Sequence, residues 1–301
     1  MSNIWPNNDR EYNIAISKLK EFKKYSELAT LLVMQSHKQV AVKTEDIIYS
    51  LSGILKSSKM LNNMDWHHIE ALFHILYKRS DVDEQVMFNL ELSYFDLFDG
   101  FNGLEPLYVY KQLKASPELF IDVISLMFAK KEESKEKSEE EQPRLKNAIK
   151  IAQKMYFKLE KDYIFNDKSE LHNWVKRAME LLDKLEDKEL SSTGMRQIGT
   201  MLANCPTDPN DDIWPIGYVR ELLEEVCNRD IIEGIVRGKY NSCSFHSVDR
   251  TNPGGYWEEK ATKFRADAAS IRFQYPKTAE ILDCLAKDFE INAKRAITDI
   301  M

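Results

Sequence analysis

Residues 254–299 read GGYWEEKATKFRADAASIRFQYPKTAEILDCLAKDFEINAKRAITD and contain two long segments with apolar side chains at helical spacing. The pair Tyr275-Pro276 separates the two segments, because proline interrupts a helix. We therefore predict a C-terminal hairpin of two helices, over about 254–273 and 277–299. The predicted apolar faces are Ala261, Phe264, Ala268 and Ile271 in the first helix and Ala279, Leu282, Leu285, Ala286 and Phe289 in the second.

The same helical periodicity recurs along most of the chain. Ser116-Pro117-Glu118 predicts a helix start, because serine caps, proline fits the first helical position and an acid complements the helix dipole. Asp65 is expected to cap a helix that runs to about Lys78. Only 10 glycines and 9 prolines are present, fewer than a large sandwich or a doubly wound sheet would need. We therefore predict an all-α protein, an irregular α-solenoid of antiparallel helices that ends in the hairpin.

One stretch interrupts the helical pattern. Residues 130–142 read KKEESKEKSEEEQ and include no apolar side chain, so they cannot join a core. We predict an N-terminal helical domain over 1–129, a charged linker over 130–143 and a C-terminal helical domain over 144–301. A charged surface loop inside one solenoid is the alternative interpretation.

The charge, the cysteine content and the apolar runs of the chain limit the partners and the cellular locations that we expect. The net charge of -7 disfavours nucleic acid as a partner. The cysteines form no CxxC pair, which is typical of free thiols in a reducing cytosol. The N-terminus has no signal-peptide pattern, and no apolar run approaches the roughly 18 residues that span a bilayer. We expect a cytoplasmic protein without a membrane contact.

A candidate metal site lies on the predicted helix 65–78. His67, Glu70 and His74 fall on one face of that helix, and imidazole and carboxylate groups are ligands for zinc or iron. The pattern is not HExxH, and surface or hydrogen-bonded histidines are the alternative. If these residues hold a metal, the protein is a metal-dependent enzyme.

A second acidic cluster lies in the predicted loop around Pro206 and Pro209. Asp208, Asp211 and Asp212 could bind a hard cation, but the spacing of an EF-hand is absent. A solvated turn is the favoured interpretation.

The long polar loop over 237–255 is the candidate partner-binding site. Its length and its aromatic side chains are typical of a segment that contacts a partner, whereas a structural loop packed across helices is the alternative. Cys243 and His246 could pair as nucleophile and base, although neighbours in sequence need not meet in space. No nucleotide-binding or nucleophile-elbow motif is present, so we expect no cofactor. The predicted contact residues are Tyr240, Phe245, His246 and Arg250.

Several segments resemble one group of proteins. Ser116 to Ile124 is similar to a DPEFFVEVI segment, and Trp214-Pro215, Gly238 to Ser242, Gly254-Gly255 and Pro276 to Ala279 are similar to later segments of the same families. The chain from about residue 65 resembles the helical C-terminal regions of very large, mostly uncharacterised bacterial proteins, some of them defence-like. Those families usually carry arginine where Cys243 stands, which argues against an anion-binding role for the loop. The resemblance implies that this chain is the C-terminal part of a longer bacterial protein.

Together these patterns favour a non-catalytic recognition or scaffold module. Stacked helices expose extended grooves, so a protein or peptide is the expected partner. The metal-dependent enzyme on the helix 65–78 is the alternative.

Overall fold

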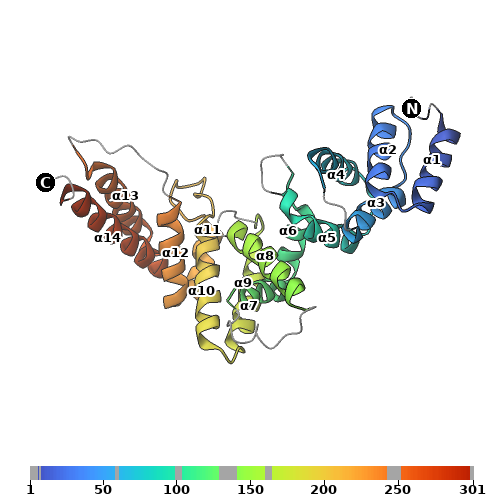
Figure 1. The fold of residues 1–301 in the computed structure, drawn as a ribbon. Coiled ribbons are helices and arrows are strands. Elements are labelled where there is room, and N and C mark those ends of the chain that lie inside the picture. The colour runs from blue at the N-terminus through green and yellow to red at the C-terminus, as the bar shows by residue number, and fades with distance from the viewer. Residues whose placement is uncertain are drawn as a thin grey trace. The chain divides into compact units, whose positions relative to one another are not determined.

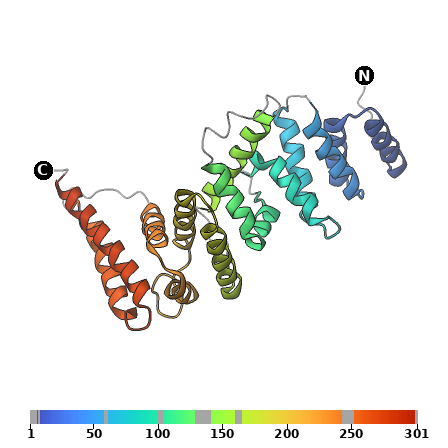
Figure 2. The ribbon, with the colours of Figure 1, turned by 90° about the horizontal axis from the view of Figure 1, so that it is seen from below.

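The computed structural model describes residues 6, 8–57, 61–98, 104–128, 141–159, 165–242 and 252–298. These residues form fourteen α-helices and one short 3-10 helix, and none of them lies in a β-strand (Figures 1 and 2). The all-α prediction is therefore confirmed, and the solenoid arrangement stays a prediction. Within the described ranges, no helix is both long enough and apolar enough to cross a membrane. The chain divides into two compact units, Met1–Gln112 and Leu113–Met301.

The first unit is built around α2, which packs against α1, α3 and α4. Phe73 lies at the centre of its core, where the ring meets Tyr94 and Phe98 edge-on at centroid distances of 5.7 and 5.4 Å. The helices of this unit are α1 (Asp9–Glu21), α2 (Tyr25–His37), α3 (Thr44–Lys56), α4 (Asn63–Leu76), α5 (Glu84–Ser93), the 3-10 helix η1 (Phe95–Leu97) and the first part of α6 (Leu107–Ala115).

The start of α4 differs from the prediction. Asn62, not Asp65, is the N-cap, and its side chain accepts hydrogen bonds from the backbone N–H groups of Met64 and Asp65, both at 2.9 Å. The Asp65 carboxylate in turn accepts a hydrogen bond of 3.1 Å from the Asn62 N–H. The two residues form a reciprocal capping box, so Asp65 contributes to the cap from inside the first turn.

A buried carboxylate fixes the start of α6. Glu91 of α5 is fully buried and accepts hydrogen bonds from the backbone N–H groups of Tyr108 and Val109, at 3.1 and 2.7 Å, and from the Tyr77 hydroxyl at 2.8 Å. Burial raises the pKa of Glu91, and the hydrogen bonds from Val109, Tyr77 and Tyr108 act in the opposite direction. The carboxylate therefore satisfies N–H groups that the first turn of any helix leaves without a partner.

The second unit contains the rest of α6 and eight further helices, and α13 and α14 lie side by side in both views (Figures 1 and 2). All nine apolar residues predicted for the inner faces of the hairpin are buried, so that prediction is confirmed. The helices are α7 (Pro117–Met127), α8 (Glu141–Leu159), α9 (Lys168–Asp183), α10 (Lys188–Leu202), α11 (Gly217–Val226), α12 (Arg229–Asn241), α13 (Gly255–Ile271) and α14 (Pro276–Thr298).

The helices on the two sides of the charged stretch belong to the same unit. Helix α7 begins as predicted, with the Ser116 hydroxyl accepting a hydrogen bond from the Leu119 N–H at 3.3 Å, and it packs on α8. The division between units lies at 112/113 instead of at the predicted linker 130–143. Helices α7 and α8 therefore belong to one unit, whereas the prediction assigns them to two domains. Residues 129–140 themselves lie outside the described ranges.

Glycines bring α10 and α12 into close contact. A Cβ atom at Gly234 of α12 would lie 2.0 Å from the carbonyl oxygen of Arg196 on α10, and one at Gly199 would lie 2.2 Å from the carbonyl oxygen of Ile231. No side chain fits between the two backbones at these points. The face of α12 that contains Gly234 and Gly238 therefore packs against α10. The opposite face of α12 is left for other contacts.

Candidate functional site

The predicted metal ligands are not brought together as a trio. His74 Nε2 lies 4.0 Å from Glu70 Oε1, whereas the His67 ring lies next to that of His68, at a centroid distance of 6.3 Å. Among the described residues, no three His, Cys, Asp or Glu side chains converge to hold a metal ion. His67 and His74 are exposed, so the geometry corresponds to the surface histidines that formed the alternative interpretation.

His68, the residue after His67, is more buried than His67 and His74. His68 is half-buried between α4 and α2, and its Nδ1 shares a hydrogen bond of 3.0 Å with the Thr30 hydroxyl. Burial lowers the pKa of His68, the nearby His67 and His37 lower it further, and Asp65 acts in the opposite direction.

This environment predicts that acid destabilises the first unit. Because the pKa of His68 is lower in the folded state than its usual 6.5, the unfolded chain binds more protons at mildly acidic pH. The contribution of His68 is complete above about pH 6.5 and is lost as pH falls through the lowered folded value. We expect urea midpoints to fall between about pH 7.5 and 5.5, with a smaller decrease in His68→Asn. His74→Asn should behave like the wild type, and an unchanged decrease in His68→Asn would contradict the assignment.

The predicted partner-binding loop is described only in part. Tyr240 lies in the last turn of α12, whereas Phe245, His246 and Arg250 fall in 243–251, outside the described residues, together with Cys243. Tyr240 is 39% exposed and lines a groove between α12 and α14. The structure therefore places one of the four predicted residues at a concave surface.

We call this surface the α12–α14 groove; its volume is about 680 Å³. Each wall is a stripe of side chains three to four residues apart, so each stripe follows one face of its helix. Both stripes cover three helical turns, about 16 Å at a rise of about 1.5 Å per residue. The lining residues are Arg229, Ile232, Glu233, Val236, Arg237 and Tyr240 from α12 and Cys284, Asp288, Ile291, Asn292 and Arg295 from α14.

The two walls run in the same general direction. Glu224, in the last turn of α11 shortly before α12 begins, accepts hydrogen bonds from the backbone N–H groups of Lys277 and Thr278 in the first turn of α14, at 3.1 and 2.9 Å. Near the other end of α12, the Tyr240 ring stacks on Phe289 of α14 at a centroid distance of 6.2 Å. The stripes on the two walls therefore run in the same direction, from Arg229 to Tyr240 on α12 and from Cys284 to Arg295 on α14.

Aromatic stacking fixes Tyr240. Its ring is nearly parallel to that of Trp257, at a centroid distance of 5.8 Å, and Trp257 stacks on Phe289 at 5.5 Å. The stack continues to Phe264, whose ring meets Trp214 edge-on at 6.4 Å. Rings packed in this way have little freedom, so Tyr240 is held in place before any ligand arrives.

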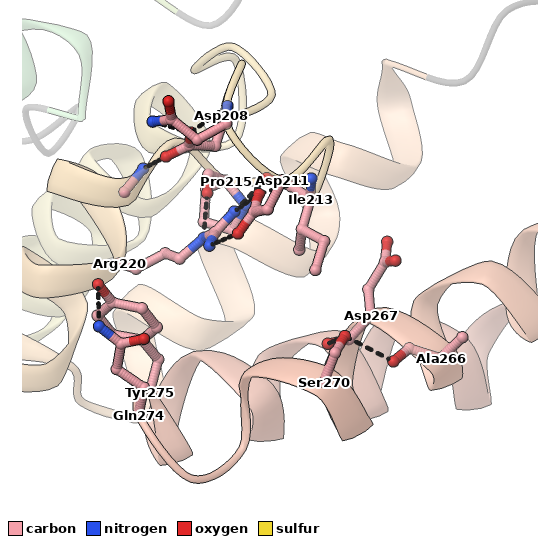
Figure 3. A network of polar contacts seen from close by, with 12 residues as sticks. Asp208, Asp211, Ile213, Pro215, Arg220, Ala266, Asp267, Ser270, Gln274 and Tyr275 are labelled. Atoms are coloured by element: carbon pink, nitrogen blue, oxygen red, sulfur yellow. Dashed lines mark hydrogen bonds and ion pairs between the residues drawn. The ribbon is translucent and has the colours of Figure 1, made fainter.

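A buried arginine lies between the acidic loop before α11 and Tyr275 in the turn before α14 (Figure 3). Arg220 of α11 is 3% exposed, and its guanidinium donates two hydrogen bonds to the Asp211 carboxylate, at 2.6 and 2.8 Å, one to the Pro215 carbonyl at 2.6 Å and one to the Ile213 carbonyl. It also lies over the Tyr275 ring, at 5.8 Å from the centroid. Arg220 thereby connects the loop before α11 with the turn between α13 and α14.

The acidic loop uses its carboxylates internally. The hydrogen bond with Arg220 holds the pKa of Asp211 below its usual range. Asp208 accepts hydrogen bonds from the N–H groups of Asn210 and Gly217, at 2.9 and 2.6 Å, and the Asn210 backbone contributes most to the lowered pKa of Asp208. These two carboxylates therefore hold the loop in shape, and the cation-binding alternative receives no support from their geometry.

Most of the groove does not follow from the composition of the loop. That composition indicates Tyr240, but it does not indicate the stripe from Arg229 to Arg237. A second stripe at helical spacing on α12, beside the glycines at 234 and 238, is the signal that could have identified it.

Comparison with known proteins gives no family for this chain. No protein-family model matches it, no curated protein matches it, and no solved structure matches it. The resemblance to the C-terminal regions of large bacterial proteins stays a prediction.

Proposed function

We propose that this chain is a helical recognition module that binds a helical segment of a partner protein in the α12–α14 groove. The observation that supports the proposal is the pair of matched stripes that line the groove. Two helices side by side with residues at i, i+3, i+4 and i+7 facing a common channel offer the geometry in which a third helix packs.

The size and chemistry of the groove fit this ligand. A length of about 16 Å accommodates about three turns of helix, or eleven residues. Ile232, Val236 and Ile291 supply apolar surface between the charged residues, as in surfaces that recognise amphipathic helices. Ile291 is 39% exposed, so part of its side chain is open to a partner.

The first test is capture of a partner by the 301-residue chain from the lysate of its natural host. Mass spectrometry identifies the partner, and a direct affinity measurement with the purified partner follows. We expect Ile291→Glu to weaken binding by about tenfold or more, because the partner's apolar side chains would then face an unpaired carboxylate.

The same helix provides a matched control. Ile297 is 40% exposed, like Ile291 at 39%, but it does not line the groove. Ile297→Glu is therefore expected to bind like the wild type. Equal affinities of the two variants would exclude the groove as the contact surface, and a chain that retains no stoichiometric partner would contradict the recognition role.

A substitution at Tyr240 tests whether the predicted partner-binding loop contributes to partner binding. Tyr240→Ala removes the ring at one end of the groove and is expected to weaken capture, whereas Phe245, His246 and Arg250 remain contact residues by sequence prediction alone.

A further inference from the structure

We infer that the α12–α14 groove selects an acidic amphipathic helix, whose carboxylates flank the apolar stripe that enters the groove. The inference rests on the proposed function and adds the chemistry of the partner to it. Its basis is the charge that lines the groove, taken together with the apolar surface between those charges.

The groove is locally basic in an acidic protein. Three arginines, Arg229, Arg237 and Arg295, line it with two acids, Glu233 and Asp288, whereas the whole chain has 42 basic and 49 acidic side chains. Glu233 also lies 3.8 Å from Arg196 of α10, and Arg237 also donates a hydrogen bond of 3.5 Å to Thr200 of α10, so both side chains have a second partner outside the groove. With three arginines and two acids, the lining carries a formal charge of +1 in a chain whose net charge is -7.

The positions of the arginines define where the partner's acids belong. Arg229 and Arg237 are about 12 Å apart along α12, at a rise of about 1.5 Å per residue. Arg295 is the last residue of the stripe on the opposite wall, six residues beyond Phe289, which Tyr240 contacts. A guanidinium pairs with a carboxylate through two parallel hydrogen bonds, so acids near both ends of a three-turn helix match these positions.

The apolar surface distinguishes a peptide from a polyanion. Ile232, Val236 and Ile291 alternate with the arginines, and a phosphate backbone gains nothing from such contacts. The net charge of -7 also repels a long polyanion, whereas a short acidic helix experiences mainly the nearby arginines. The chemistry therefore points to a helix with apolar residues on one side and carboxylates at its borders.

The test uses a displayed library of helical 15-residue peptides with a constant apolar stripe and random flanking positions. The 301-residue chain selects from it, and peptides that also bind the uncharged variant Ile291→Asn are discarded. We expect the selected peptides to contain more Asp and Glu than Lys and Arg. Groove-dependent peptides without an acidic excess would overturn this inference and leave the proposed function intact. A selection that yields no groove-dependent peptide would overturn both.

Charge reversal assigns the effect to the arginines. The double variant Arg237→Glu/Arg295→Glu is expected to bind the best acidic peptide about tenfold or more weakly and to prefer a version with lysine at the acidic positions. Lys287→Glu/Lys294→Glu changes the same charge at exposed positions of α14 that do not line the groove, and its affinity should change less than about threefold. Equal losses in the two double variants would overturn the assignment, and the thermal midpoint of each variant reports whether it is folded.

Discussion

Gly234→Ala is expected to destabilise the second unit by about 2–3 kcal/mol, although alanine usually stabilises a helix relative to glycine by about 1 kcal/mol. The new Cβ atom would lie 2.0 Å from the carbonyl oxygen and 2.8 Å from the carbonyl carbon of Arg196. Both are backbone atoms of α10, so they cannot rotate away, and the two helices must separate. Urea unfolding measures the loss, and amide exchange in α10 and α12 locates it.

Gly194, a glycine of α10, provides the control. A Cβ atom at Gly194 would lie 2.3 Å from a terminal methyl group of Leu182, which belongs to a side chain that can change rotamer. Gly194→Ala is therefore expected to cost at most about 1 kcal/mol. Equal losses in the two variants, or a stabilised Gly234→Ala protein, would show that α10 and α12 are not in backbone contact. Separation of the helices should also weaken partner binding, since it displaces the α12 wall of the groove.

Arg220→Met is expected to destabilise the second unit by about 2–3 kcal/mol. The substitution keeps an unbranched stem but removes the guanidinium and with it the donors to Asp211, Pro215 and Ile213. The loss should stay below the upper range for broken buried ion pairs, because Asp211 is 39% exposed and regains water. We expect faster amide exchange at Ile216 and Gly217, whose N–H groups donate within this loop.

Arg265 offers the matched comparison for this substitution. It also pairs with two acids, Asp283 and Glu290, at 3.2 and 3.0 Å, but its side chain is 46% exposed. Arg265→Met should therefore cost less than about 1 kcal/mol, as is typical of surface ion pairs. If Arg220→Met and Arg265→Met unfold at the same urea concentration, burial of Arg220 contributes nothing and its supporting role is contradicted.

Local patterns predicted the helices and their buried faces well. The inner faces of the hairpin, such as Phe264 and Phe289, follow from apolar residues spaced three to four apart, and the start of α7 follows from Ser116-Pro117. The cap of α4 was misplaced by three residues, because Asn62 and Asp65 are both good capping residues and only their reciprocal hydrogen bonds decide between them.

The division of the chain could not be predicted from composition. The stretch 130–143 looks like a linker because it contains almost no apolar side chain, yet α7 and α8 on its two sides pack against each other. A polar composition indicates that a connecting segment stays out of the core. It does not indicate whether the two helices that the segment joins belong to the same core.

The periodicity of the sequence is therefore sufficient for the all-α class and for the faces that each helix buries, since those depend on residues within a few turns of one another. The contact of Gly234 with α10, the position of Arg220 under the loop and the groove between α12 and α14 arise only in the folded chain. Each of these features joins residues that are distant in sequence, and their meeting depends on how close two helices can approach, which no local pattern encodes.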